Sequence, residues 1–363
     1  MDLYRAGLSV MAAAVVVALA ACSGAQSETT QSAAKRRPPV SAPPSAKALP
    51  KPPREPYTIA FGGDVHFEGV LRGRLDADPK TALGPIAKVL RGADLAMVNL
   101  ETAITTGGDK APGKQFTFRA PPSALTALRA AGVDVVSMAN NHGMDYMQTG
   151  LADSLAAIRR ARFPVVGIGK DAAQAYRPWR TTVNGNKVAV IGATQVLDDH
   201  LIPAWTAADG KGGLASAKNE ERLLREVRAA RKVSDTVIVH LHWGTEMAAC
   251  PNPAQRALAP KLVAAGADVV VGGHAHILLG AGYLDSAYVS YGLGNFVFYS
   301  GGGITSKTGV LTLTVNGRKV LKSEWTPAQI QGGVPIPLTG PAKSQAVSAW
   351  QGLRGCTGLT ARP

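Results

Sequence analysis

Six of the seven histidines in this sequence of 363 residues stand close to carboxylate or amide side chains at the ends of short apolar runs. The groups are, in chain order, Asp64 with His66, Asn99 with Glu101, Asn140 and Asn141 with His142, His240 and His242 with Glu246, and His274 with His276. One polar pair at a strand end is usually a cap or a turn. Five groups that hold nearly every histidine are hard to assign to turns. Imidazole, carboxylate and amide oxygen together suit a divalent metal such as Mn, Zn or Fe, so the sequence predicts a metal site.

The spacing inside two of these groups also fits a metal site. Side chains two residues apart project to the same face of an extended strand, so His274 and His276 can converge on one centre or on two adjacent centres. The same holds for His240 and His242. We prefer His242 as the ligand because the strand ends directly after it, and we place His240 behind the ligands or in the core. Glu246 is expected either to orient a ligand or to be an ordinary surface carboxylate.

The elements that must position these residues alternate between strands and helices, which predicts an α/β fold. In such sheets ligands bind beyond the carboxyl ends of the strands, where the polar groups stand. Asn-Gly pairs at 184–185 and 316–317 indicate hairpins. The expected strands are 57–64, 94–101, 133–142, 163–169, 187–194, 235–244, 268–276 and 287–298, and the expected helices are 122–131, 148–162, 216–232 and 254–265.

The last of these runs, "YGLGNFVF" (291–298), has Gly292, Gly294 and Asn295 inside an apolar strand. Glycine in a strand indicates the close approach of another backbone or of a ligand. Asn295 can therefore face the metal centre, although packing is the preferred interpretation.

Taken together, "GGDVH", "NLE", "NNHGMD", "HWGTE", "GGHAH" and "YGLGNFVF" resemble, in order and spacing, the CapA-type poly-γ-glutamate capsule biosynthesis proteins of the calcineurin-like metallophosphoesterase superfamily. The resemblance covers about residues 57 to 300. It implies a four-layer α/β/β/α sandwich with up to two metal ions between its sheets. It also implies a role in synthesis of an anionic envelope polymer such as polyglutamate, alongside membrane-bound synthase subunits. Both a metal-dependent hydrolase or transferase and a non-catalytic polymer-binding or export subunit agree with it.

Site roles carried over from this resemblance fall on individual residues. Asp64, His66 and His276 match ligands of the first metal, and Asn141, His242 and His274 match those of the second. His142 resembles the histidine that protonates a leaving oxygen, and Asp145 is expected to orient it. The superfamily's bridging aspartate has no counterpart here. Asn99-Leu100-Glu101 stands in its place, which makes Glu101 the expected bridging ligand, with Asn99 behind it.

The first 56 residues are expected to lie outside the folded domain. An apolar run from residue 6 to residue 21 is too short for a comfortable membrane span and ends at Cys22, as in a bacterial lipoprotein signal. An ordinary secretory signal is the alternative. Residues 22–56 are rich in Pro, Ser and Ala and predict a disordered stalk. We therefore expect a signal peptide at 1–21, lipidation at Cys22, a domain at 57–330, a C-terminal extension at 331–363, and a location on the outer face of the cell membrane.

The charge and cysteine content limit the partners. Seven of the 39 Lys and Arg residues and three of the 25 Asp and Glu residues precede residue 57, so the formal charge of +14 divides into +4 before that residue and +10 after it. The basic residues do not cluster with aromatic ones, so a nucleic-acid partner is not expected. Cys250 and Cys356 can pair in an oxidising compartment, but sequence alone leaves that disulfide open.

Overall fold

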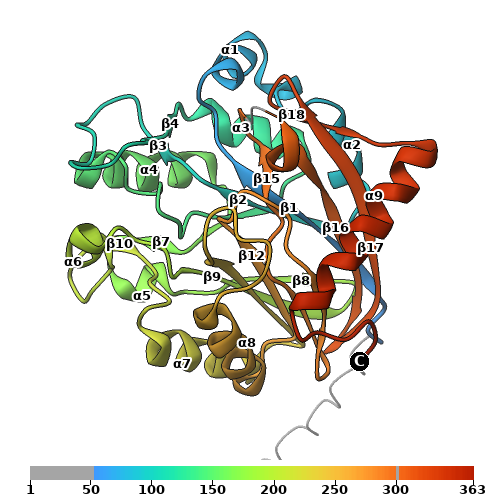
Figure 1. The fold of residues 1–363 in the computed structure, drawn as a ribbon. Coiled ribbons are helices and arrows are strands. Elements are labelled where there is room, and N and C mark those ends of the chain that lie inside the picture. The colour runs from blue at the N-terminus through green and yellow to red at the C-terminus, as the bar shows by residue number, and fades with distance from the viewer. Residues whose placement is uncertain (1–52, 300–301) are drawn as a thin grey trace, which may run out of the picture. The chain divides into compact units, whose positions relative to one another are not determined.

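The apolar runs form two β-sheets that pack face to face (Figure 1). The computed structural model describes residues 53–299 and 302–363. The expected signal peptide, Cys22 and the expected stalk as far as residue 52 lie outside the described residues. The last residues expected in the stalk contact the domain, since Arg54 pairs with Asp235 at 2.6 Å and the backbone N–H of Glu55 donates to Asn184.

The first sheet, sheet 1, has the order β18-β17-β16-β1-β2-β5-β6, and β15 also pairs with β1. β1, β2, β5 and β6 run parallel, so their carboxyl ends meet at one edge. The strands are β1 (Tyr57–Val65), β2 (Leu95–Leu100), β5 (Val135–Ser137), β6 (Val165–Val166), β15 (Asn295–Val297), β16 (Lys307–Asn316), β17 (Lys319–Gln331) and β18 (Val334–Pro337).

The second sheet, sheet 2, has the order β13-β14-β12-β11-β9-β8, in which β9, β11, β12 and β14 are parallel. Its strands are β8 (Trp179–Val183), β9 (Asn186–Thr194), β11 (Thr236–His242), β12 (Val269–Gly273), β13 (Ala281–Leu284) and β14 (Ala287–Ser290). Two short pairs complete the strands: β3 (Ala103–Ile104) with β4 (Arg119–Ala120), and β7 (Ile168–Gly169) with β10 (Gly213–Leu214).

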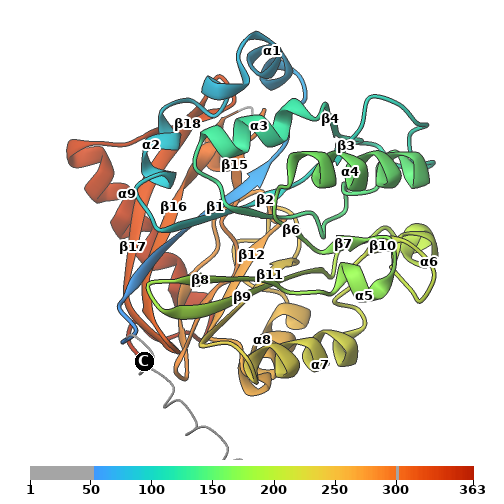
Figure 2. The same ribbon diagram turned by 180° about the vertical axis from the view of Figure 1, so that it is seen from behind.

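Helices cover the outer face of each sheet, with α3 and α4 over sheet 1 and α7 and α8 over sheet 2 (Figure 2). The helices are α1 (Val70–Ala77), α2 (Ala87–Leu90), α3 (Ser123–Ala130), α4 (Met147–Ala161), α5 (Ala172–Ala175), α6 (Ile202–Trp205), α7 (Glu220–Arg231), α8 (Pro253–Ala265) and α9 (Gly340–Gly352). The longest has 15 residues, and none in the described part of the chain has the length and hydropathy of a membrane span.

Successive side chains of a strand point to opposite faces of its sheet, and this alternation produces the layers. In β11, Ile238 belongs to the core between the two sheets, whereas Val237, Val239 and Leu241 belong to the core under α7 and α8. In β2, Met97 faces sheet 2, and Ala96 and Val98 face the helices. The expected four-layer α/β/β/α sandwich is therefore confirmed. Both hairpins are also confirmed: Asn184 and Gly185 form the loop between β8 and β9, and Gly317 and Arg318 form that between β16 and β17.

Residues after 330 belong to the same unit. β18 extends sheet 1, α9 packs against β17, and a disulfide joins Cys356 to Cys250. The core clusters lie entirely between Tyr57 and Leu359, within the compact unit formed by residues 51–363. Because this unit contains its own cores, we expect it to fold without the residues that precede it.

Candidate metal centre

A β-bulge turns Asp64 into the space between the sheets. Between Phe61 and Asp64, β1 advances three residues while its partner β2 advances two, from Met97 to Asn99. The extra residue reverses the alternation, so that Asp64 lies on the same side as Phe61. Two glycines make this possible, because a Cβ on Gly63 would stand 1.9 Å from the carbonyl oxygen of Gly294. "GGDVH" is therefore a bulge that aims a carboxylate.

The histidines of sheet 2 reach the same space from the opposite side. His240 and His242 share the face of Ile238, which packs between the sheets. His274 and His276 follow β12 with φ angles of 95° and 57°, in the left-handed region that non-glycine residues rarely adopt. The backbone N–H of His274 donates to Oδ2 of Asp64 at 2.9 Å and ties the two sheets together. Strain of this kind is concentrated at functional sites.

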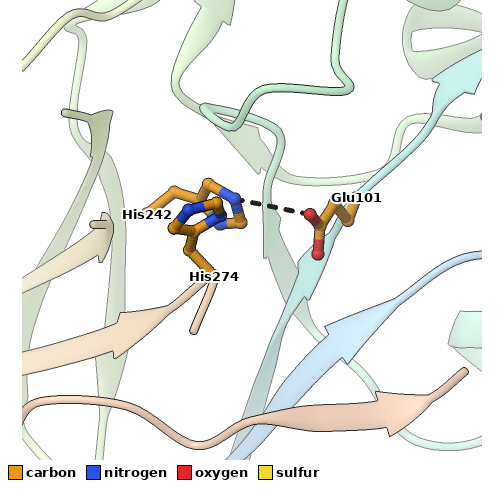
Figure 3. Close-up of side chains that lie close together, drawn as sticks. All are labelled: Glu101, His242 and His274. Atoms are coloured by element: carbon orange, nitrogen blue, oxygen red, sulfur yellow. Dashed lines mark ion pairs between the residues drawn. The ribbon is translucent and has the colours of Figure 1, made fainter. Parts of the chain in front are cut away.

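Two groups of side chains have ligand atoms within 4.8 Å of one another, and Glu101 belongs to both. One group is Glu101, His242 and His274 (Figure 3); the other is Asp64, Glu101 and His276. Nε2 of His242 stands 3.4 Å from Oε1 of Glu101. Glu101, which is expected from the sequence to bridge two ions, is thus the carboxylate common to both groups.

The residues present fit a divalent cation, and the environment of the Glu101 carboxylate is the main reason. Its side chain is fully buried, and neither carboxylate oxygen accepts a hydrogen bond within residues 53–299 and 302–363. A buried carboxylate without a partner is costly unless a cation compensates its charge. The donor set of imidazole nitrogens and carboxylate oxygens suits Mn, Zn or Fe and does not select among them.

The electrostatics of the groups also fit a cation. Burial, with the neighbouring Glu101 carboxylate, raises the pKa of Asp64 to about 6, and burial raises the pKa of Glu101 as well. Burial lowers the pKa of His242 to about 4 and the pKa of His274 well below its ordinary value. Burial alone would lower the pKa of His276, but Glu101 and Asp64 outweigh it, so the pKa is raised. The lowered pKa values keep the imidazoles of His242 and His274 neutral near pH 7, as a metal ligand requires.

Three amide side chains hold the ligands in place. Nδ2 of Asn99 donates to Oδ1 of Asp64 at 2.8 Å and lies 3.1 Å from Nδ1 of His242. Oδ1 of Asn141 lies 2.7 Å from Nε2 of His242, which puts this amide oxygen beside the first group. Oδ1 of Asn295 lies 2.8 Å from Nδ1 of His276. The preferred interpretation of Asn295 as packing is thereby corrected, because the residue holds an expected ligand.

His142 stands beside the ligand groups on a hydrogen-bonded support. Its Nδ1 lies 2.5 Å from Oδ2 of Asp145, and its Nε2 lies 3.9 Å from Oε1 of Glu101. The ring stacks on Phe118 at 4.0 Å between centroids. This is the arrangement of a histidine oriented by a carboxylate with its second nitrogen facing the reacting groups.

Sequence reasoning missed Lys114. Its Nζ lies 2.7 Å from Oδ1 of Asp145 and donates to the backbone carbonyl of Asn141, and its side chain is 5% exposed. The ammonium also stands over the ring of Trp205. Lys114 lies between β3 and β4 in a segment without helix or strand periodicity, so no sequence pattern pointed to it. Lys114 thus contacts both the side chain of Asp145 and the backbone next to His142.

The structure does not bring His66 into either group. The register of β1 against β15 shifts between Asp64 and Val65, so an Asp and a His two residues apart do not share a face here. Nδ1 of His66 accepts a hydrogen bond from the N–H of Glu68 at 3.0 Å, and the ring packs among Phe118, Phe298 and Tyr299. His66 therefore lies in the aromatic wall of the site.

Two further expected residues stand apart from the ligand groups. His240 is buried between the sheets and burial lowers its pKa to about 3, so the core position is the one observed. Glu246 is 59% exposed, and its Oε1 is 3.9 Å from Nε2 of His276, so it stands at the rim of the site.

A cleft of about 330 Å³ gives access to the groups. Asn141, His142 and His276 form its floor, and exposed Phe116 and Tyr299 stand at its mouth. The remaining lining residues are Lys114, Gln115, Phe118, Asp198, Glu246 and Phe298. The cleft lies at the carboxyl ends of the parallel strands, where ligands bind in α/β folds.

Two facing sheets, helical outer layers and a histidine and carboxylate cluster between the sheets define a four-layer α/β/β/α sandwich with a candidate metal centre. Within that class, the chain belongs to the bacterial capsule synthesis protein family PGA_cap, whose model matches residues 58–300.

Relatives agree with the family. Capsule biosynthesis protein CapA of Bacillus anthracis is 31% identical over 263 residues, which cover 70% of this chain and 62% of that protein. The "Probable polyglutamine synthesis accessory protein" of Mycobacterium tuberculosis is 30% identical over 233 residues, which cover 61% of either chain. The chain thus spans about three fifths of the length of these curated relatives. A solved phosphatase of Mycoplasma pneumoniae has a TM-score of 0.49 and 14% identity, and the match covers 80% of this chain and 97% of that one.

Proposed function

We propose that this protein is a metal-dependent hydrolase or transferase that acts on a phosphoester, amide or related bond during synthesis of poly-γ-glutamate or a related envelope polymer. The observation that carries the proposal is the buried carboxylate of Glu101, which has no hydrogen-bond partner in the described residues and is common to both ligand groups. The names of the relatives support the polymer, and the ligand set supports the chemistry.

The proposed chemistry assigns separate work to separate residues. Asp64, Glu101, His242, His274 and His276 hold one or two ions, with the Asn141 oxygen beside them. A bound divalent ion supplies Lewis-acid polarisation of the scissile bond and activation of water. In this proposal His142 delivers a proton from Nε2 to the leaving oxygen, and Asp145 orients the ring and stabilises its protonated form against burial and the Lys114 charge, which lower the pKa of His142. Phe118, stacked on His142, excludes water from one side of the imidazole.

The membrane context is part of the proposal. We propose that the mature chain is exported and held at the outer face of the cell membrane by lipid at Cys22, next to membrane-bound synthase subunits. The test is Cys22→Ala in the full chain, followed by membrane fractionation. The variant is expected in the released fraction, and its persistence in the membrane fraction would remove the lipid anchor from the proposal.

A second candidate is a non-catalytic subunit that binds or guides the polymer. It is favoured by the name of the mycobacterial relative, which is called an accessory protein. It is also favoured by His66, because this side chain contacts aromatic rings and does not join a ligand group.

One experiment separates the two candidates. The purified chain is loaded with Mn, Zn or Fe, its metal content is measured, and it is assayed on bis(p-nitrophenyl) phosphate and on γ-glutamyl peptides. The hydrolase proposal expects turnover with stoichiometric metal, and loss of both in Asp64→Ala. Binding of poly-γ-glutamate that survives Asp64→Ala and His274→Ala, without turnover of any substrate, supports the accessory subunit.

A further inference from the structure

Six basic side chains gather at the end of the domain opposite the metal centre, and we call this surface the basic face. They come from the amino ends of the strands: the residue stretch before β1, the start of β9, the connection from α7 to β11, and the turn between β16 and β17. Two adjoining hollows share Arg54 and are lined by these side chains. The residues of the basic face are Arg54, Lys187, Arg231, Lys232, Arg318 and Lys319.

Three of these cations form ion pairs within the domain, and the other three are available to bind a partner. Arg231 and Arg318 pair with buried Asp268 at 2.5 and 3.0 Å, and Arg54 pairs with Asp235. Lys187, Lys232 and Lys319 are exposed and form no ion pair within the described residues. Six cations against Asp235, Asp268 and the exposed Glu55 next to Arg54 leave an excess of three positive charges, so the basic face attracts an anionic partner.

An apolar side chain stands among these cations. Val233, next to Lys232, is 56% exposed and lines one of the two hollows. A soluble polyanion gains nothing from an exposed valine. A bilayer surface accommodates both features, because the cations meet the headgroups and the aliphatic side chain enters the acyl boundary.

Connectivity supports the same partner, and this step rests on the lipid anchor proposed at Cys22. The described chain begins at Pro53, which lines a hollow of the basic face, so the 52 preceding residues join the domain here. The metal centre lies at the other ends of the same strands. β11 runs for seven residues from Thr236, beside the basic face, to His242, and its six steps of about 3.3 Å span roughly 20 Å. In Figure 1 the start of β1 and the turn between β16 and β17 lie together at the bottom.

We propose that the basic face binds the anionic headgroups of a phospholipid bilayer, with Lys187, Lys232 and Lys319 as the contacting cations. The metal cleft then faces away from the bilayer. The inference does not depend on the proposed catalytic function, since no residue of the basic face belongs to a ligand group.

The test measures vesicle binding by residues 51–363 and by its variants. Vesicles of phosphatidylcholine with 30% phosphatidylglycerol are compared with vesicles of phosphatidylcholine alone in a sedimentation assay. We expect binding to the anionic vesicles only, and weakening as the salt concentration rises from 0.1 to 0.5 M. The triple variant Lys187→Glu, Lys232→Glu, Lys319→Glu is expected to bind at least tenfold more weakly, because each basic residue near the surface contributes about 1 kcal/mol.

A matched control removes the same charge elsewhere. The triple variant Lys88→Glu, Arg160→Glu, Lys343→Glu changes exposed residues of α2, α4 and α9 and is expected to bind within about twofold of the parent. Circular dichroism checks that both variants are folded, and Val233→Ser, which keeps every charge, is expected to weaken binding severalfold.

Three outcomes overturn the proposal. Equal losses in the two triple variants would assign the effect to net charge alone. If the parent protein does not bind anionic vesicles, the basic face is not a membrane-binding surface. Finally, binding of soluble poly-γ-glutamate that the first triple variant loses, without vesicle binding by the parent, would assign the face to the polymer.

Discussion

Asp145 lies between Lys114 and His142 and contacts each with a different oxygen. Oδ1 stands 2.7 Å from the ammonium of Lys114, and Oδ2 stands 2.5 Å from Nδ1 of His142. All three side chains are nearly or fully buried beside the cleft. The orientation of His142 is thus set by a charge that lies outside the ligand groups.

Glu101→Gln should separate metal binding from stability. The substitution keeps the shape of the side chain but removes the carboxylate common to both ligand groups, so metal content is expected to fall to a small fraction of the parent value. The metal-free protein should become more stable by about 1–3 kcal/mol, because a buried unpaired carboxylate is replaced by a neutral amide. Metal analysis and chemical denaturation of the metal-free protein measure the two effects. Glu246→Gln, at the exposed rim, serves as the control and should change neither.

His142→Ala should lose turnover and keep its metal. A proton donor touches only the leaving group, so its removal is expected to lower kcat by about 10²- to 10⁴-fold with metal content nearly unchanged. Asp64→Ala should lose both, because Asp64 offers an oxygen to the metal itself. An emptied site in His142→Ala would instead make His142 a ligand.

Lys114→Met should shift the pH profile of turnover. Burial raises the pKa of Asp145 to about 7, and the charge of Lys114 acts in the opposite direction. Without that charge the pKa rises further, so Asp145 stays protonated to higher pH and the acidic limb of kcat moves upward. At pH 7 we expect about a tenfold loss that recovers at higher pH, with metal content unchanged.

Two variants keep the Lys114 prediction specific. Lys114→Arg retains the charge and should restore much of the activity. Lys110→Met removes an exposed charge from the same segment and should leave the profile in place. A profile that moves equally in Lys110→Met and Lys114→Met would show a general charge effect.

Gly63→Ala should prevent or severely weaken folding. The added Cβ would stand 1.9 Å from the carbonyl oxygen of Gly294, so the bulge in β1 cannot form without backbone movement. We expect a loss of more than about 4 kcal/mol of unfolding free energy or no soluble protein. Gly73→Ala, at an exposed position of α1 where the added Cβ would meet no neighbouring side chain within 4 Å, should be neutral or stabilising by about 0.5–1 kcal/mol. Denaturant titration of both variants is the measurement.

The sequence predicts the layers well because they follow from local patterns. Apolar runs and Asn-Gly pairs report which segments are strands, and the amphipathic segments between them report the helices. Histidines at strand ends then gather at one edge because parallel strands end together. Asp64, Glu101, His242, His274 and His276 are accordingly brought together.

The remaining features depend on contacts that periodicity does not report. The bulge at Gly62 and Gly63 and the shift after Asp64 change which side chains share a face, and this separates His66 from Asp64. Lys114 reaches Asp145 from an irregular segment, and its partner is 31 residues further along the chain. Asn295 supports His276 because β15 pairs in parallel with the bulged end of β1.

The contact between Asp64 and His274 joins residues that are 210 positions apart in the sequence. The complete set of candidate ligands runs from Asp64 to His276, so the pocket does not exist until β12 has docked against β1. If the proposed metal site is correct, ion loading must follow synthesis of most of the chain. Because such ligand sets select weakly among transition metals, the ion bound by the proposed site would then depend on the supply of ions in the compartment where folding finishes.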